Sequence, residues 1–102
     1  MPLLDNHIAA VTGSGSGIGR AIALGYAREG ARVVLLDINE KAAAEAAREI
    51  RDAGSKAESF ALDVTQREDC IAVAKQVADK VGQVSILVKR RHQPPQRLHG
   101  GG

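Results

Sequence analysis

The stretch Val11–Ala21 reads VTGSGSGIGRA and places four glycines within seven positions. It follows the apolar run IAAVT at residues 8–12 and leads into an alanine-rich segment with helical periodicity. Glycine loses the most backbone entropy on folding, so a dense run of it indicates a tight turn or a close approach. A strand, a glycine-rich turn and a helix in this order predict a phosphate-binding turn at the start of the helix.

The spacing of these glycines separates three kinds of phosphate-binding turn. A P-loop ends in Gly-Lys-Ser/Thr, whereas this run ends in Gly-Arg-Ala at residues 19–21. The long-chain dinucleotide pattern G-x-G-x-x-G also fails, because counting from Gly13 or from Gly15 does not end on a glycine. The pattern that fits is T-G-x-x-x-G-x-G, from Thr12 to Gly19.

Each position of this pattern has a physical reason to be small or polar. We expect Gly13 to allow the sharp exit from the strand, and Gly17 to leave room for a pyrophosphate at the positive end of the helix. Gly19 lets the helix pack closely on the strand. Ser14 and Ser16 offer hydroxyl groups to phosphate or ribose. The alternative interpretation is a flexible linker that happens to be rich in glycine and serine.

The rest of the chain alternates short apolar runs with longer helical segments. The runs at residues 8–12, 31–37, 57–64 and 84–88 are predicted strands, and the segments between them are predicted helices. Strands that are apolar on both faces and separated by helices indicate parallel βαβ units. We therefore predict an α/β fold, a partial Rossmann fold of four parallel strands in the order 3-2-1-4 with three helices.

Two of the predicted helices carry a recognisable start and an apolar stripe. Asn39 is a predicted N-cap of the second helix, and Thr65 with Glu68 has the spacing of a capping box for the third. The stripes predicted to face the core are Ala43, Ala46, Ala47, Ile50 and Ala53 in the second helix, and Ile71, Ala74, Val77, Ala78 and Val81 in the third.

Asp37 ends the second predicted strand, eighteen residues after Gly19. A carboxylate at this place can accept hydrogen bonds from both hydroxyls of an adenine ribose. It would repel a 2′-phosphate, and the next residues, Ile38 and Asn39, carry no positive charge. The sequence therefore favours NAD over NADP. The alternative is an ordinary exposed aspartate at a strand end.

Asp63 and Val64 come at the end of the third predicted strand. Parallel strands end at the same edge of a sheet, so these residues offer a side chain and a backbone group beside an adenine ring. The alternative is that Asp63 only shapes the turn before Thr65.

Composition and charge narrow the class of protein. Apolar residues make up 44% of the chain and charged residues 25%, as in ordinary globular proteins. Four of the 14 basic residues lie in residues 89–102, which contain no acid, so residues 1–88 hold ten basic and twelve acidic side chains. This balance argues against nucleic acid as a partner. No apolar run is long enough to cross a membrane, the histidines show no metal-ligand spacing, and the single cysteine, Cys70, suggests a reducing, cytoplasmic location.

Four segments in order, VTGSGSGIG, VVLLD, ALDV and VSILV, resemble the short-chain dehydrogenase/reductase family. The resemblance runs from about Leu4 to Val88. It implies an NAD-dependent oxidoreductase that interconverts an alcohol and a ketone by hydride transfer and, as in the family, forms oligomers. The residues that the resemblance implies for cofactor binding are Gly13, Ser16, Gly17, Ile18, Gly19, Asp37, Asp63 and Val64.

The resemblance stops after Val88. The family continues with Asn-Asn-Ala-Gly, whereas residues 89–92 are Lys-Arg-Arg-His. The family's catalytic serine and Tyr-x-x-x-Lys pair have no counterpart, because the single tyrosine, Tyr26, is followed four positions later by Gly30. We assign no catalytic residue. Two other functions stay open: a nucleotide-binding fragment without catalysis, and an interaction protein that uses its basic tail.

A reading-frame change accounts for the abrupt end of the resemblance. The codons AAC AAC GCC GGC ATC encode Asn-Asn-Ala-Gly-Ile. Loss of one CA from AACAAC yields AAA CGC CGG CAT, which encodes Lys-Arg-Arg-His, as at residues 89–92. We therefore expect residues 1–88 to be the N-terminal half of a NAD-binding domain. Residues 89–102 are expected to be a disordered basic tail produced by a frameshift or a sequencing error, which the codons at this site can test.

Overall fold

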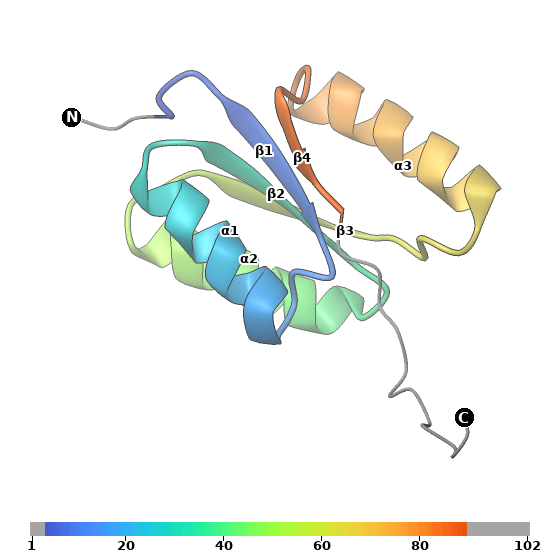
Figure 1. Cartoon of the computed structure of the whole chain (residues 1–102), viewed down its shortest axis with the longest axis horizontal. Helices are drawn as coiled ribbons and strands as arrows, with labels where there is room; N and C mark the ends of the chain where they lie inside the picture. Colours follow the sequence, from blue (N-terminus) through green and yellow to red (C-terminus); the bar gives the residue numbers. More distant parts are fainter. Residues whose placement is uncertain (1–3, 90–102) are drawn as a thin grey trace, which may run out of the picture.

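The computed structural model describes residues 4–89. Strands and helices alternate along the whole of this range, as the sequence pattern predicts (Figure 1). In chain order, the elements are β1 (Ile8–Thr12), α1 (Gly17–Arg28), β2 (Arg32–Asp37), α2 (Glu40–Asp52), β3 (Ala57–Ala61), α3 (Arg67–Lys80) and β4 (Ile86–Val88). The expected disordered tail lies outside the described residues, apart from Lys89, which is exposed.

The four strands form one parallel sheet in the order β3-β2-β1-β4, which confirms the predicted topology. Strand β1 lies inside the sheet, where Ala10 is level with Val34 of β2 on one side and with Leu87 of β4 on the other. Helices α1 and α2 cover one face of the sheet and α3 lies over the other (Figure 1). The sheet is therefore the middle of three layers.

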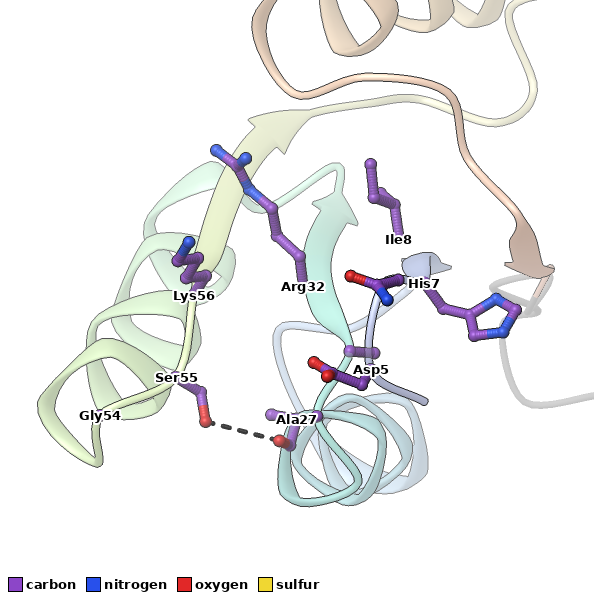
Figure 2. A pocket seen from close by; sticks show the side chains of 11 residues that line it. Asp5, His7, Ile8, Ala27, Arg32, Gly54, Ser55 and Lys56 are labelled. Atoms are coloured by element: carbon purple, nitrogen blue, oxygen red, sulfur yellow. Dashed lines mark hydrogen bonds between the residues drawn. The ribbon is translucent and has the colours of Figure 1, made fainter. Parts of the chain in front are cut away.

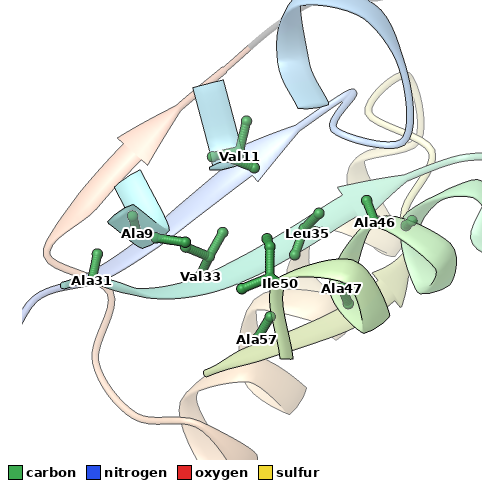
Figure 3. Close-up of a cluster of buried hydrophobic side chains, with 12 residues drawn as sticks. Ala9, Val11, Ala31, Val33, Leu35, Ala46, Ala47, Ile50 and Ala57 are labelled. Carbon is green, nitrogen blue, oxygen red and sulfur yellow. The ribbon is translucent and has the colours of Figure 1, made fainter. Parts of the chain in front are cut away.

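Alternation along β1 and β2 divides the core into two clusters, because successive side chains of a strand point to opposite faces. Ala9 and Val11 of β1 pack with Val33 and Leu35 of β2 on the α1/α2 face (Figure 3). Ala10, Val34 and Leu36 pack on the α3 face. Both strands are thus apolar on both faces, as is typical of a covered parallel sheet.

The stripe predicted for α2 is largely confirmed. Ala43, Ala46, Ala47 and Ile50 are buried against the sheet, whereas Ala53 follows the last residue of the helix and is exposed. These small side chains let α2 approach the sheet closely. Asn39 caps the helix as predicted, since its side-chain oxygen accepts a hydrogen bond from the Ala42 amide at 3.1 Å.

The stripe predicted for α3 is only partly right. Val77 and the unpredicted Val73 are buried, but Ile71 is 60% exposed. Ala74 and Ala78 are also exposed and line a cleft of about 630 Å³ between α3 and the sheet. Helix α3 therefore contacts the sheet along a narrower face than its sequence suggests. The prediction was too broad because an apolar stripe in the sequence does not show how much of it meets a neighbouring element.

The capping box predicted at Thr65 and Glu68 is wrong. Helix α3 begins at Arg67, and both the amide and the hydroxyl of Thr65 donate hydrogen bonds to Oδ1 of Asp63, at 3.0 and 2.6 Å. Asp63 competes successfully for Thr65 because it lies two residues away and forms a local turn. The third strand is also shorter than predicted, ending at Ala61 rather than at residue 64.

The two clusters give a direct test of the packing. Leu35 is fully buried in the central part of the sheet, so we expect Leu35→Ala to lower the free energy of unfolding by about 2–5 kcal/mol. The matched control is Ile71→Ala on the exposed side of α3, with a change within about 0.5 kcal/mol. Urea denaturation of the two variants measures both effects. Similar losses for the two substitutions would contradict this assignment of the core.

Candidate functional site

The glycine-rich turn and Asp37 meet at the carboxyl edge of the sheet. The turn follows β1, Asp37 ends β2, and these two strands are neighbours. The Ser14 amide donates to the Leu36 carbonyl oxygen at 3.4 Å, which draws the turn over the end of β2. The edge beyond the carboxyl ends of the strands is where open α/β sheets bind their ligands.

The three glycines of the pattern T-G-x-x-x-G-x-G have conformations or neighbours that a side chain would disturb. Gly13 and Gly17 have φ values of 64° and 60°, in the left-handed region that favours glycine. A Cβ atom on Gly19 would lie 2.8 Å from the carbonyl carbon of Gly13 and would overlap its oxygen. At Gly19 the helix therefore lies close to the turn that leaves the strand, rather than to the strand itself as predicted. Space is open where a side chain on Gly17 would lie.

The start of α1 has neither a capping side chain nor an acidic residue. The Ser16 side chain makes no capping hydrogen bond, and the first turn of the helix contains no acidic residue. Helix α2 differs, because Asn39 caps it and Glu40 lies in its first turn. Free amide groups and the helix dipole make the first turn of α1 electropositive, and Ser16, Gly17 and Ile18 are exposed there.

Gly15 is the residue of this site that the sequence pattern missed. Its amide donates a hydrogen bond to Oδ2 of Asp37 at 2.8 Å, and the Asn39 amide donates to Oδ1 of the same carboxylate at 3.0 Å. A Cβ on Gly15 would lie 2.7 Å from the Cβ of Ala42 and 2.8 Å from the Asp37 oxygen. The sequence signal that could have identified Gly15 is that a glycine stands at a position where the pattern T-G-x-x-x-G-x-G accepts any residue.

The two serines of the turn differ in position. Ser14 is fully buried, and its hydroxyl donates a long hydrogen bond of 3.5 Å to the Leu36 carbonyl oxygen. The expectation that Ser14 contacts phosphate or ribose is therefore not supported. Ser16 is exposed beside the open end of α1.

Asp63 and Val64 lie at the same edge of the sheet, one strand beyond Asp37. The Leu62 amide donates to the Asp37 carbonyl oxygen at 2.9 Å, so the segment leaving β3 runs next to the end of β2. The hydroxyl of Thr65, and then its amide, hold the pKa of Asp63 below the ordinary value. Val64 packs against the cluster on the α3 face. The alternative role of Asp63, shaping the turn before Thr65, is thus realised in the structure.

The remaining candidate residues have structural partners. Tyr26 and Cys70 are half-buried and pack against the two core clusters. Among residues 4–89, no three histidine, cysteine or acidic side chains lie close enough together to hold a metal ion. No helix in the same range is both long and apolar enough to span a membrane.

A separate hollow of about 440 Å³ lies at the opposite, amino edge of the sheet (Figure 2). Asp5, His7, Arg32 and Lys56 are among its lining residues, and the Ser55 hydroxyl donates to the Ala27 carbonyl oxygen at 3.4 Å. The carboxyl edge is the usual ligand side of such sheets, so we do not assign this hollow to the site.

Comparison with known proteins identifies relatives of this architecture. The sequence profile of the short chain dehydrogenase family matches residues 7–90. An uncharacterized oxidoreductase, YxbG, of Bacillus subtilis is 44% identical over 87 residues, which are 85% of this chain and 32% of that protein. The 7alpha-hydroxysteroid dehydrogenase of Escherichia coli K12 is 41% identical over 85 residues, 83% of this chain and 33% of the relative.

Solved structures agree with the fold. A hydroxysteroid dehydrogenase from Escherichia coli superimposes with a TM-score of 0.82 at 41% identity, covering 84% of this chain and 37% of that one. A putative D-mannonate oxidoreductase from Haemophilus influenza, solved with bound NAD, gives 0.79 at 32% identity over 82% of this chain and 30% of that one. The chain spans about a third of the length of the curated relatives it matches.

The close approach at Gly19 predicts opposite effects for two glycine substitutions in α1. Gly19→Ala forces a Cβ onto the Gly13 carbonyl group, so we expect a loss of about 1–3 kcal/mol in the free energy of unfolding. Gly25 has open space around it, and Gly25→Ala should raise stability by about 0.5–1 kcal/mol. Thermal or urea unfolding compares the two. A stabilised Gly19→Ala variant would be inconsistent with this packing.

The Asp63–Thr65 hydrogen bonds predict a dependence on pH. Thr65→Val removes the hydroxyl that contributes most to the lowered pKa of Asp63, so this pKa should rise toward its ordinary value, whereas Thr65→Ser should leave it low. A lowered pKa in the folded state stabilises the fold above the unfolded-state pKa, and this contribution is lost as pH falls through the lowered value. NMR titration of the Asp63 carboxyl carbon measures the shift. An unchanged pKa in Thr65→Val would exclude the hydroxyl as its cause.

Proposed function

Because this chain belongs to the short-chain dehydrogenase family, whose members use NAD or NADP, we propose that residues 13–64 bind NAD for an oxidoreductase that interconverts an alcohol and a ketone. The observation that carries the proposal is the position of Asp37 against the glycine-rich turn, beside the open end of α1. When bound, NAD accepts or supplies the hydride of the reaction. The chain's own residues bind and orient the nucleotide.

The pyrophosphate would lie against the first turn of α1. Its negative charge suits amide groups that have no acidic or capping side chain near them. The open space at Gly17 permits close approach to the backbone, and a hydroxyl is available on the exposed Ser16. Gly13 and Gly19 would shape this turn, and Ile18 would contribute at the helix start. This arrangement supports phosphate binding without a lysine or a metal ion.

Asp37 would hold the adenine ribose. An ionised carboxylate offers about four lone-pair positions. The amides of Gly15 and Asn39 use two of them, one on each oxygen, which leaves one on each oxygen for the two ribose hydroxyls. A 2′-phosphate would instead bring negative charge against this carboxylate, and its neighbours Ile38 and Asn39 carry no charge to offset the repulsion. NAD is therefore the proposed cofactor.

The adenine ring would lie toward the segment leaving β3, where Asp63 and Val64 are half-buried. The substrate is proposed only as a class, a small alcohol or ketone. Relatives bear the names of dehydrogenases of 7α-hydroxysteroid, estradiol and sorbitol, so the family resemblance does not select one substrate. No residue of this chain is proposed to act on the substrate, since the nucleotide-binding residues alone have counterparts in it. We also propose that the protein forms oligomers and is located in the cytoplasm.

A second candidate function is nucleotide binding without catalysis by this chain. It is favoured by one specific observation: every assigned residue lies between Gly13 and Val64, while the single tyrosine, Tyr26, packs against the core. Both candidates require the same nucleotide site, so the measurement of binding comes first.

Calorimetric titration of the full chain with NAD and NADP tests the proposal. Asp37→Ala should weaken NAD binding roughly tenfold or more, because a hydrogen bond to a charged group contributes about 1.5–3 kcal/mol and 1.4 kcal/mol is tenfold. The affinity for NADP should change less. Asp79→Ala, an exposed acid on α3, is the matched control and should bind as the unmodified chain does. Equal affinities of the unmodified chain for NAD and NADP would refute the role of Asp37.

A further inference from the structure

The Asp37 carboxylate is held in position by hydrogen bonds from the protein's own backbone. One oxygen accepts the Gly15 amide at 2.8 Å and the other the Asn39 amide at 3.0 Å. Gly15 lies in the glycine-rich turn, and Asn39 caps α2. The carboxylate therefore bridges the turn and the start of α2, and hydrogen bonds to an ionised acceptor are stronger than those between neutral groups.

Gly15 makes this bridge sterically possible. It is buried, and a Cβ at this position would meet three groups at once: the Ala42 Cβ at 2.7 Å, Oδ2 of Asp37 at 2.8 Å and the Ala43 amide nitrogen at 3.1 Å. Two of these belong to the first turns of α2, which packs against the sheet and cannot easily move. The Asp37 side chain is the group that can rotate away.

We propose that Gly15 is a specificity-determining residue that acts through Asp37. Its lack of a side chain lets the Asp37 carboxylate rest on the turn, and the fixed negative charge then separates NAD from NADP. The inference rests on the proposed NAD site and adds the residue that positions the discriminating charge. A larger residue at position 15 displaces the carboxylate, which removes both the acceptor for the ribose hydroxyls and the repulsion of a 2′-phosphate.

Gly15→Ala in the full 102-residue chain is the primary test. NAD affinity should fall roughly tenfold, as expected for losing a hydrogen bond to a charged group, and NADP affinity should fall less. The ratio of NAD affinity to NADP affinity should therefore fall. A merely structural role in the turn would weaken both nucleotides equally, and an unchanged ratio would overturn the inference.

The double variant Gly15→Ala with Ala42→Gly separates two causes of the effect. Removing the Ala42 methyl group relieves the collision with α2 but leaves the collision with Asp37. The ratio of NAD affinity to NADP affinity should stay as low in this variant as in Gly15→Ala. Recovery of the original ratio would show that crowding between the turn and α2, rather than displacement of Asp37, was responsible, and would overturn the inference.

Amide hydrogen exchange in the nucleotide-free chain provides a readout that needs no cofactor. Asp37→Ala should accelerate exchange of the Gly15 and Asn39 amides, with little change at Gly25 in α1. Unchanged exchange at Gly15 would overturn the inference. If the unmodified chain shows no preference for NAD, the proposed function fails and this inference with it. If it prefers NAD and Gly15→Ala keeps that preference, only this inference fails.

Discussion

Strand β1 is hydrogen-bonded along both edges and covered on both faces, and the rest of the fold depends on this position. Its residues 9–11 are almost inaccessible and no larger than valine, so helices on each face can approach the sheet closely. The chain can leave a strand buried in this way only at its carboxyl end. The chain must leave there in a tight turn, and Gly13 provides it. The site therefore forms where burial of β1 stops.

The site separates two kinds of charge over a short length of chain. At the start of α1, backbone amides present positive charge to the solvent without an acidic residue in the first turn. At the end of β2, Asp37 presents negative charge that is anchored by amides on two sides. A dinucleotide carries its negative charge on phosphates and its donors on sugar hydroxyls, so the two halves of the site are complementary to the two chemistries of one ligand.

The spacing of apolar residues and the residues that mark the ends of elements were sufficient to predict the architecture. Apolar strands and the cap at Asn39 are local signals, and the structure follows them closely. The errors occur where a tertiary or competing contact decides. Asp63 takes the hydroxyl of Thr65 that was expected to cap α3, and Ser14 turns its hydroxyl into the protein. Gly15 was overlooked because its reason to be glycine lies on β2 and α2, which no local pattern reveals.

The short strand β4 joins the most distant parts of the described chain. Ala9 is level with Ile86, and the Ser85 hydroxyl accepts a hydrogen bond from the Ile8 amide across 77 positions. The entropy cost of closing a loop grows slowly with its length, so a pairing between residues this far apart costs little more than a closer one. The three residues of β4 thus hold the last described strand against the first.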